Sequence, residues 1–205
     1  LMMTVLAAYP LSRRDWDGRR FFMGMMTFTM FFSGGLIPTY LVIRQLNLLN
    51  RFWALILPSA VSCWNVIIMR TFFSNLPLEL QEAAQIDGCS NTRLLLRIVL
   101  PLSLPILAVT VLYYAVGHWN AYFNALIYLT DTKLYPLQLV LRQILLQNDT
   151  GKMADTGVET EAAKLLIVES LRFAIIIVSS LPVLMIYPFI QRYFVKGVMI
   201  GAIKG

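Results

Sequence analysis

The chain has 205 residues, of which 58% are hydrophobic and 14% are charged, and its formal net charge is +6. A soluble domain of this length would carry about a quarter charged residues, so the composition excludes an ordinary soluble protein. The basic residues stand between apolar blocks, most densely in an Arg-rich loop at 11–20. This placement favours a membrane protein over a nucleic-acid-binding protein.

Four long apolar blocks predict membrane-spanning helices, because about 20 apolar residues cross roughly 30 Å of hydrocarbon. The blocks occupy 21–43, 52–69, 98–130 and 173–191, and none contains an acidic residue, lysine or arginine. The apolar stretch at the start of the chain is too short to span, and we interpret 1–10 as the inner end of a further span whose beginning is missing. It is not a signal peptide, because no basic segment precedes it. The prediction is an all-α, polytopic membrane protein with a single transmembrane domain over 1–205.

Helix-breaking residues interrupt each of the four spans. Proline removes a backbone donor, and such breaks are tolerated in a membrane where the backbone is buried in protein or lines a cavity. Gly and Pro are also commoner in membrane helices in general, so only the four interruptions together favour a channel or transporter. The interrupting residues are Ser33, Gly34, Gly35, Pro38, Pro58, Pro101, Pro105, Pro182 and Pro188.

The Arg-rich loop sets the predicted topology, since Lys and Arg in short loops mark the cytoplasmic side. With 11–20 inside, the loop 74–97 and the tail 191–205 are also cytoplasmic, while 44–51 and 117–171 lie outside. The outer segments carry basic residues as well, but long outer loops translocate regardless of charge.

The outer region 117–171 is the longest polar insert. After Pro136, apolar residues recur on one helical face and predict an amphipathic helix on or under the outer membrane surface. These residues are Leu137, Val140, Leu141, Ile144 and Leu145. The polar stretch 148–160 predicts a loop.

The cytoplasmic segment that follows the second full span predicts a short surface helix. Asn75 suits an N-cap with Pro77 in the first turn, and Gly88 suits a left-handed stop. Ser90 or Asn91 can then cap a second helix that runs into the membrane. On these features alone the segment is either an ordinary connection between two spans or a docking element for a partner.

The spacing within this segment resembles a family signature. Glu82-Ala83-Ala84, three residues, Gly88, nine residues, Ile98, one residue and Leu100-Pro101 match the EAA motif of permease subunits of binding-protein-dependent ATP-binding-cassette (ABC) importers. The resemblance implies the type I importer fold, with this loop as the coupling helix that sits in a cleft of the ATPase. It assigns ATPase coupling to Glu82, Ala83, Ala84, Asp87 and Gly88.

The resemblance extends over the whole chain and is greatest to the smaller permease of the carbohydrate group, related to the maltose system. The stretches that carry it are 33–41, 118–126 and 191–205, and the subgroup is the one that handles oligosaccharides. It departs at the N-terminus, where the family's first span and most of the second are missing, which we interpret as truncation.

This resemblance implies an inner-membrane permease of a bacterial sugar importer and its partners. They are a second permease in a heterodimer, two ATPase subunits that bind ATP and Mg²⁺, and an extracytoplasmic solute-binding protein. It also implies that the C-terminal tail contacts the ATPase, through Lys196, Gly197, Gly201 and Lys204.

Chemistry typical of enzymes is missing from the sequence. There is no G-x-x-x-x-G-K-[ST] sequence, and the single histidine, His118, excludes an H-E-x-x-H zinc site. We predict a transport subunit with no catalytic residue, metal or cofactor of its own. The spans are nearly free of ionisable residues, whereas proton-coupled carriers usually keep Asp, Glu or His in the membrane.

Amide and aromatic side chains in the spans are candidates for contact with a sugar, because pockets combine a few polar groups with apolar walls. The alternative is hydrogen bonding between helices by Asn, and interfacial anchoring by Trp and Tyr. The candidates are Trp64 and Asn65 in mid-span, and Asn120, Tyr122 and Asn124 near the outer end of their span.

Two other functions remain open at this stage. The chain could be an ABC importer permease for another solute, or a membrane protein of another class whose inner loop docks an unrelated partner. The sequence does not identify the sugar, because one permease shows only half of a cavity.

Overall fold

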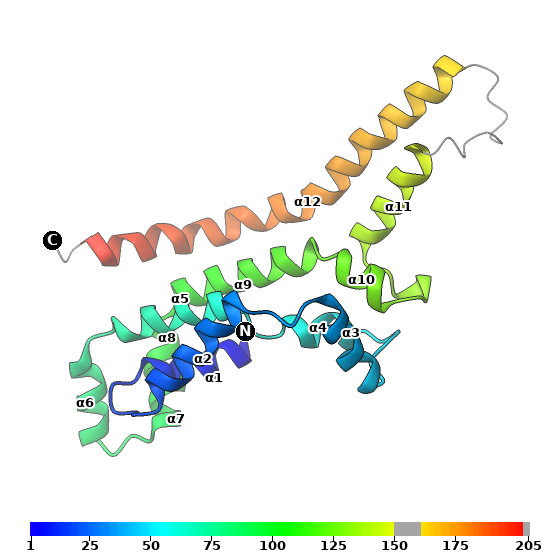
Figure 1. The fold of residues 1–205 in the computed structure, drawn as a ribbon. Helices are drawn as coiled ribbons and strands as arrows, with labels where there is room; N and C mark the ends of the chain where they lie inside the picture. The colour runs from blue at the N-terminus through cyan, green and yellow to red at the C-terminus, as the bar shows by residue number, and fades with distance from the viewer. Residues whose placement is uncertain (150–160, 203–205) are drawn as a thin grey trace. The chain divides into compact units, whose positions relative to one another are not determined.

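The computed structural model describes residues 1–149 and 161–202, with side chains over 1–146, 169–188 and at Gln191. Within these residues all secondary structure is helical, as predicted (Figure 1). The helices before the first break in the description are α1 (Met2–Ser12), α2 (Arg19–Phe31), α3 (Leu36–Gln45), α4 (Trp53–Ile56), α5 (Cys63–Ser74), α6 (Leu78–Ile86), α7 (Asn91–Leu94), α8 (Leu100–Leu102), α9 (Leu104–Trp119), α10 (Phe123–Tyr128) and α11 (Leu137–Asp149). The last helix is α12 (Glu161–Ala202), and α7 joins α8 through a π-helical turn, η2 (Leu95–Val99).

Breaks divide three of the four predicted spans into bent helix pairs. The axes turn by 113° between α2 and α3, by 50° before α5 and by 83° between α8 and α9. The first break contains Ser33, Gly34 and Gly35, of which Gly35 adopts a positive φ of 84°. The second break follows Pro58, and the third lies between Pro101 and Pro105, so both are close to the predicted positions. A side chain satisfies one backbone group freed by a break, since the Ser62 N–H donates to the Tyr114 hydroxyl at 2.9 Å. This is how a broken helix is accommodated inside a membrane protein.

The fourth span differs from the expectation, because α12 runs unbroken past both Pro182 and Pro188. Its segment Glu169–Pro188 is long and apolar enough to cross a membrane. A proline removes one N–H from the ladder, and here the remaining bonds hold the helix together. The predicted amphipathic helix is confirmed as α11, which includes Asn148 and Asp149; the rest of the predicted loop 148–160 lies outside the described residues.

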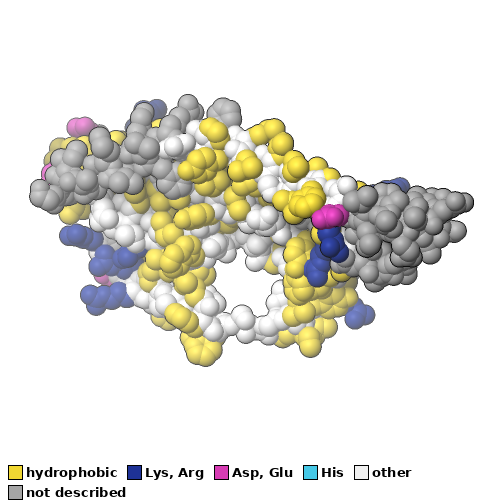
Figure 2. Space-filling model, turned by 90° about the horizontal axis from the view of Figure 1, so that it is seen from above, with side chains coloured by type: hydrophobic (Ala, Val, Ile, Leu, Met, Phe, Trp, Pro, Cys, Tyr) yellow, Lys and Arg dark blue, Asp and Glu magenta, His cyan; other side chains and the backbone are white. Residues whose placement is uncertain are grey.

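The chain forms two compact units, and the first comprises Leu1–Val42, Ile56–Ala115 and Ile190–Gly205. Its core joins α1 to α5, where Tyr9 and Phe73 meet edge to face with ring centroids 6.5 Å apart. Leu94 and Val99 extend this core from the α7–η2 segment. Many other apolar side chains are exposed, and yellow areas spread over the visible face in Figure 2. Because lipid is as apolar as leucine, close side-chain contact rather than burial from water holds such helices together.

The second unit comprises Ile43–Leu55 and Val116–Phe189. Asn50 organises it from a left-handed conformation with φ of 60°. Its backbone N–H donates to the Tyr128 carbonyl at 2.9 Å, and its side-chain oxygen accepts from the N–H groups of Thr130 and Asp131 at 2.8 and 2.9 Å. These bonds fix the segment between α10 and α11. A small hydrophobic core in this unit contains Leu129 and Leu139.

Candidate functional site

Helix α6 (Leu78–Ile86), which carries the Glu-Ala-Ala sequence, has its N-cap two residues later than expected. Asn75 is the C-cap of α5, where its N–H donates to the carbonyls of Phe72 and Phe73, so its predicted role as N-cap is wrong. Pro77 takes the N-cap position of α6 with extended backbone. Proline suits this position because its missing N–H is not needed there. Glu79 lies in the first turn, where a carboxylate favours the positive end of the helix dipole.

The end of α6 is a Schellman motif, which confirms the predicted glycine stop. Gly88 has a φ of 71°. Its N–H donates to the Gln85 carbonyl at 3.0 Å, and the Cys89 N–H donates to the Ala84 carbonyl at 2.9 Å. This pair of bonds, with Cys89 packed against the core that includes Ala84, defines the motif. Ser90 then caps α7 by accepting from the Arg93 N–H at 3.4 Å, as predicted.

The two alanines of the motif point about 100° apart around the helix and differ in burial. Ala84 is 7% exposed and belongs to the core of the first unit, whereas Ala83 is exposed. Around the helix, Ala83 shares its side with residues at i−4 and i+3, as helical periodicity requires. We call this side the outer face of α6; it consists of Glu79, Glu82, Ala83, Ile86 and Asp87, all exposed. Ile86 is 86% exposed, and the sequence analysis did not identify it as an apolar side chain on this face. A helical projection of 78–87 with Ala84 placed inward would have found it.

An arginine connects α6 to the end of α1. Arg13 holds Asp15 with two hydrogen bonds, Nε to Oδ1 at 2.9 Å and Nη2 to Oδ2 at 2.8 Å. Its third donor, Nη1, bonds to Oε1 of Gln81 on α6 at 3.1 Å. The hydrogen bond from Arg13 lowers the pKa of the Asp15 carboxyl. The ion pair is therefore present at neutral pH, and its contribution to stability is lost only as the pH falls through that lowered pKa.

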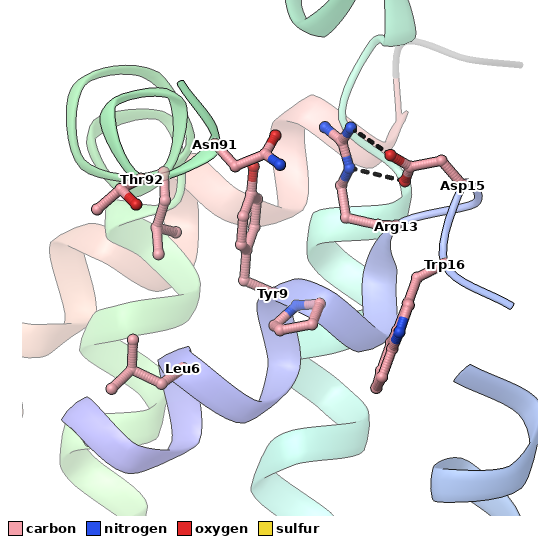
Figure 3. Close-up of a pocket in the computed structure, with 9 residues that line it drawn as sticks. Leu6, Tyr9, Arg13, Asp15, Trp16, Asn91 and Thr92 are labelled. Carbon is pink, nitrogen blue, oxygen red and sulfur yellow. Dashed lines mark hydrogen bonds and ion pairs between the residues drawn. The ribbon is translucent and has the colours of Figure 1, made fainter. Parts of the chain in front are cut away.

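A cavity of about 440 Å³ lies beside this connection, between α1 and the α7–η2 segment (Figure 3). Tyr9, Arg13, Trp16 and Asn91 line it among others. The buried Tyr9 hydroxyl has no hydrogen-bond partner among the described residues. None of the predicted substrate residues lies here.

Trp64 and Asn65 occupy the first turn of α5, directly after the break in their span, rather than the middle of a helix. Trp64 is 59% exposed, whereas Asn65 is 5% exposed. The Asn65 N–H donates to the side chain of Ser62, the N-cap of α5, at 3.4 Å. The two residues therefore present different chemistry, a free aromatic face and a buried amide, at the break.

In the second unit, Asn120 lines a hollow of about 270 Å³ that the sequence analysis did not foresee. Gln138 of α11 and two neighbouring serines of α12, Ser179 and Ser180, share the hollow. The Trp119 indole N–H donates to the Ser179 carbonyl at 2.8 Å and holds α9 to α12 at this point. The hydroxyls of Ser179 and Ser180 donate to the Ile176 carbonyl, at 3.0 and 2.7 Å. They therefore offer acceptor oxygens to the hollow, whereas the two amides can both donate and accept.

The other two predicted substrate residues do not line this hollow. The Tyr122 ring lies under the guanidinium of Arg142, whose Cζ is 4.3 Å from the ring centroid. Asn124 is half-buried in α10.

The side chains of the residues predicted to contact the ATPase from the tail lie outside the described residues. Lys196, Gly197 and Gly201 belong to the helical backbone of α12, while Lys204 lies outside the described residues.

Comparison with known proteins gives a family match over nearly the whole chain. Residues 1–200 match the family described as binding-protein-dependent transport system inner membrane component. The chain is 45% identical over its full length to the polygalacturonan/rhamnogalacturonan transport system permease protein YtcP of Bacillus subtilis and covers 71% of it. It is 46% identical to the protein LplC of the same organism, again over its full length and 68% of the relative.

A solved structure shares the fold. The crystal structure of a bacterial ABC transporter involved in the import of the acidic polysaccharide alginate matches 95% of this chain and 68% of its own, with a TM-score of 0.80 and 34% identity.

Proposed function

The chain belongs to the family of binding-protein-dependent transport system inner membrane components, and from this premise we propose how it couples ATP hydrolysis to transport. It is a permease subunit of an ABC importer and not an enzyme. The family match excludes the alternative of an unrelated membrane protein whose loop docks some other partner. Permeases of this family act with a second permease, an ATPase and a solute-binding protein.

The outer face of α6 is the observation that carries the proposal. It exposes three carboxylates, a small residue that allows close approach and the apolar Ile86, on a helix whose buried residue is Ala84. Ile86, in the last turn of α6, adds an apolar contact to this charged face, and a docking helix can use such a residue as an anchor. In this proposal an ATPase subunit binds this face, binds ATP and Mg²⁺ itself, and displaces α6 when it closes. The full assembly is a heterodimer of permeases with two ATPase subunits and an extracytoplasmic binding protein, in the bacterial inner membrane.

The substrate in this proposal is a carbohydrate, and specifically an oligosaccharide. Support comes from the relatives, whose names refer to polygalacturonan and rhamnogalacturonan transport and to alginate import. The hollow at Asn120 suits a polyhydroxylated solute, because its two amides donate and accept hydrogen bonds without charge and its two serine oxygens can accept them. Asn65 and Trp64 at the break before α5 are further contacts in the path.

The experiment that tests the coupling role is the charge reversal Glu82→Lys. We expect the subunit to insert normally but to retain less ATPase on co-purification, and to show little substrate-stimulated hydrolysis in proteoliposomes. Asp17→Lys is the matched control, since Asp17 is an exposed carboxylate of the α1–α2 connection. An importer that assembles and transports normally with Glu82→Lys would show that Glu82 is only a solvated helix charge.

A further inference from the structure

We infer that Arg13 is a positioning residue for coupling, because it links the helix that binds the ATPase to the first helix of the membrane body. The inference rests on the proposed function, since it presupposes that the ATPase docks on α6. It concerns a different contact, however, the bond between Gln81 and the connection that follows α1, in a small hollow that Glu82 also borders.

The first step is the rigidity of the arginine. Two of its donors hold Asp15 in a bidentate pair, which fixes the plane of the guanidinium. The Arg13 side chain is 10% exposed and that of Asp15 is 64% exposed. The exposed carboxylate therefore pairs with the positive charge of a guanidinium that is largely shielded from water. The third donor is left to point at Gln81. A fixed guanidinium loses less entropy on binding Gln81 than a free side chain would.

The second step is where the arginine is anchored. Arg13 is the C-cap of α1, and its backbone N–H donates to the Pro10 carbonyl. The two residues before it are held by α5, because Arg70 Nε donates to the Leu11 carbonyl at 3.3 Å and Ser74 Oγ to the Ser12 carbonyl at 3.4 Å. The end of α1 is thus fixed to α5, and Arg13 extends from a firmly held point.

The third step is what else connects α6 to the body. Its chain connections are the short turn at Pro77 and the Schellman turn at Gly88, and Ala84 is its buried residue. Leu76 and Cys89, just outside the two ends of α6, pack against the same core, so within the helix the Ala84 methyl group is the buried contact and resists rotation about the helix axis poorly. The Arg13–Gln81 bond is directional and lies one turn from Ala84, so it fixes this rotation. A displacement of α6 is then passed to α1 as well as to α7.

The test measures solute imported per ATP hydrolysed by the complete importer in proteoliposomes. With Arg13→Ala we expect this ratio to fall by about tenfold, the order of effect of one hydrogen bond to a charged group, while the ATPase still co-purifies. Arg20→Ala is the matched control, because Arg20 is an exposed arginine in the first turn of α2 and has no hydrogen bond to α6 among the described residues. It should leave the ratio unchanged.

A second variant separates positioning from folding. Gln81→Met removes the acceptor but leaves the Arg13–Asp15 pair intact, so no buried charge loses its partner. It should reproduce the lower ratio, and adding it to Arg13→Ala should cause no further loss, because both remove the same interaction. Gln81→Glu, which keeps an acceptor for Arg13, should retain the wild-type ratio.

Two results overturn the inference. A wild-type ratio with Gln81→Met shows that the bond transmits nothing. Loss of ATPase co-purification with Gln81→Met shows that this side of α6 belongs to the docking surface. Neither result affects the proposed function, which fails only if the outer-face variant Glu82→Lys transports normally.

Discussion

At Gly88 the backbone lies in the left-handed region, with a φ of 71°, and a Cβ built on it meets no atom within 4 Å. Any penalty for a side chain here is therefore one of backbone conformation and not of space. That penalty is roughly 1–2 kcal/mol for most residues, is lower for Asn and is greatest for β-branched residues. The position thus allows side chains to be ranked by conformation alone.

We accordingly predict that Gly88→Asn preserves transport and that Gly88→Val reduces it, although both subunits insert. Valine would change the direction in which α7 leaves α6. Uptake and ATPase co-purification, measured side by side for the two variants, check this. Normal uptake and normal ATPase co-purification for both variants would show that the left-handed turn is irrelevant to coupling.

The two alanines give a second prediction, because they differ in burial and not in type. Ala84→Met places extra atoms in a packed core and should destabilise the subunit by about 1–3 kcal/mol. Ala83→Met leaves the fold unchanged but blocks close approach of the ATPase. We expect thermal stability in detergent to fall only for Ala84→Met, and ATPase binding to fall for Ala83→Met at normal stability. Reduced stability of Ala83→Met would contradict the assignment of the outer face.

At the scale of elements, the contact of α9, α11 and α12 creates the polar hollow. We predict that Asn120→Ala and Gln138→Leu raise the KM for transport, because each removes hydrogen-bonding groups from the proposed solute path. Asn124→Ala should change KM less, since Asn124 does not line the hollow. Asn65→Ala tests the break before α5 in the same assay. If Asn65→Ala and Asn120→Ala both leave KM and rate unchanged, the substrate path is elsewhere.

The C-terminal segment supports a separate prediction. Deleting 197–205 should lower substrate-stimulated ATP hydrolysis without preventing membrane insertion, because it removes Gly197, Gly201 and Lys204, which are predicted to contact the ATPase. The deletion leaves the apolar part of α12, Glu169–Pro188, complete. Membrane fractionation provides the control for insertion, and normal stimulated hydrolysis would assign the tail no role.

At the scale of the whole molecule, orientation in the membrane is the main prediction. The Arg-rich loop at 11–20 predicts that α6 and the tail lie on the cytoplasmic side. In a chain with Cys63 and Cys89 replaced by alanine, Ser90→Cys should react with an impermeant thiol reagent only after cells are opened. Thr132→Cys, in the region predicted to lie outside, should react in intact cells. Labelling of Ser90→Cys in sealed cells would reverse the topology.

The sequence by itself determined the features that depend on neighbouring residues. Composition and apolar block length predicted the spans, Gly and Pro located the breaks, and the Gly88 stop and the Ser90 cap followed from local backbone preferences. Local reasoning failed where two local preferences competed, as when Asn75 ended α5 and Pro77 capped α6. It also failed where a helix continued through Pro182.

Tertiary structure alone decided which side chains meet. Nothing in the sequence pairs Arg13 with Gln81, 68 residues away, or brings Asn120 to the serines of α12. Such contacts depend on how whole helices pack, and helix packing is set by the sum of many weak contacts rather than by any one residue. The same packing separates Ala83 from Ala84, which are identical as residues but differ because only one of them faces the core.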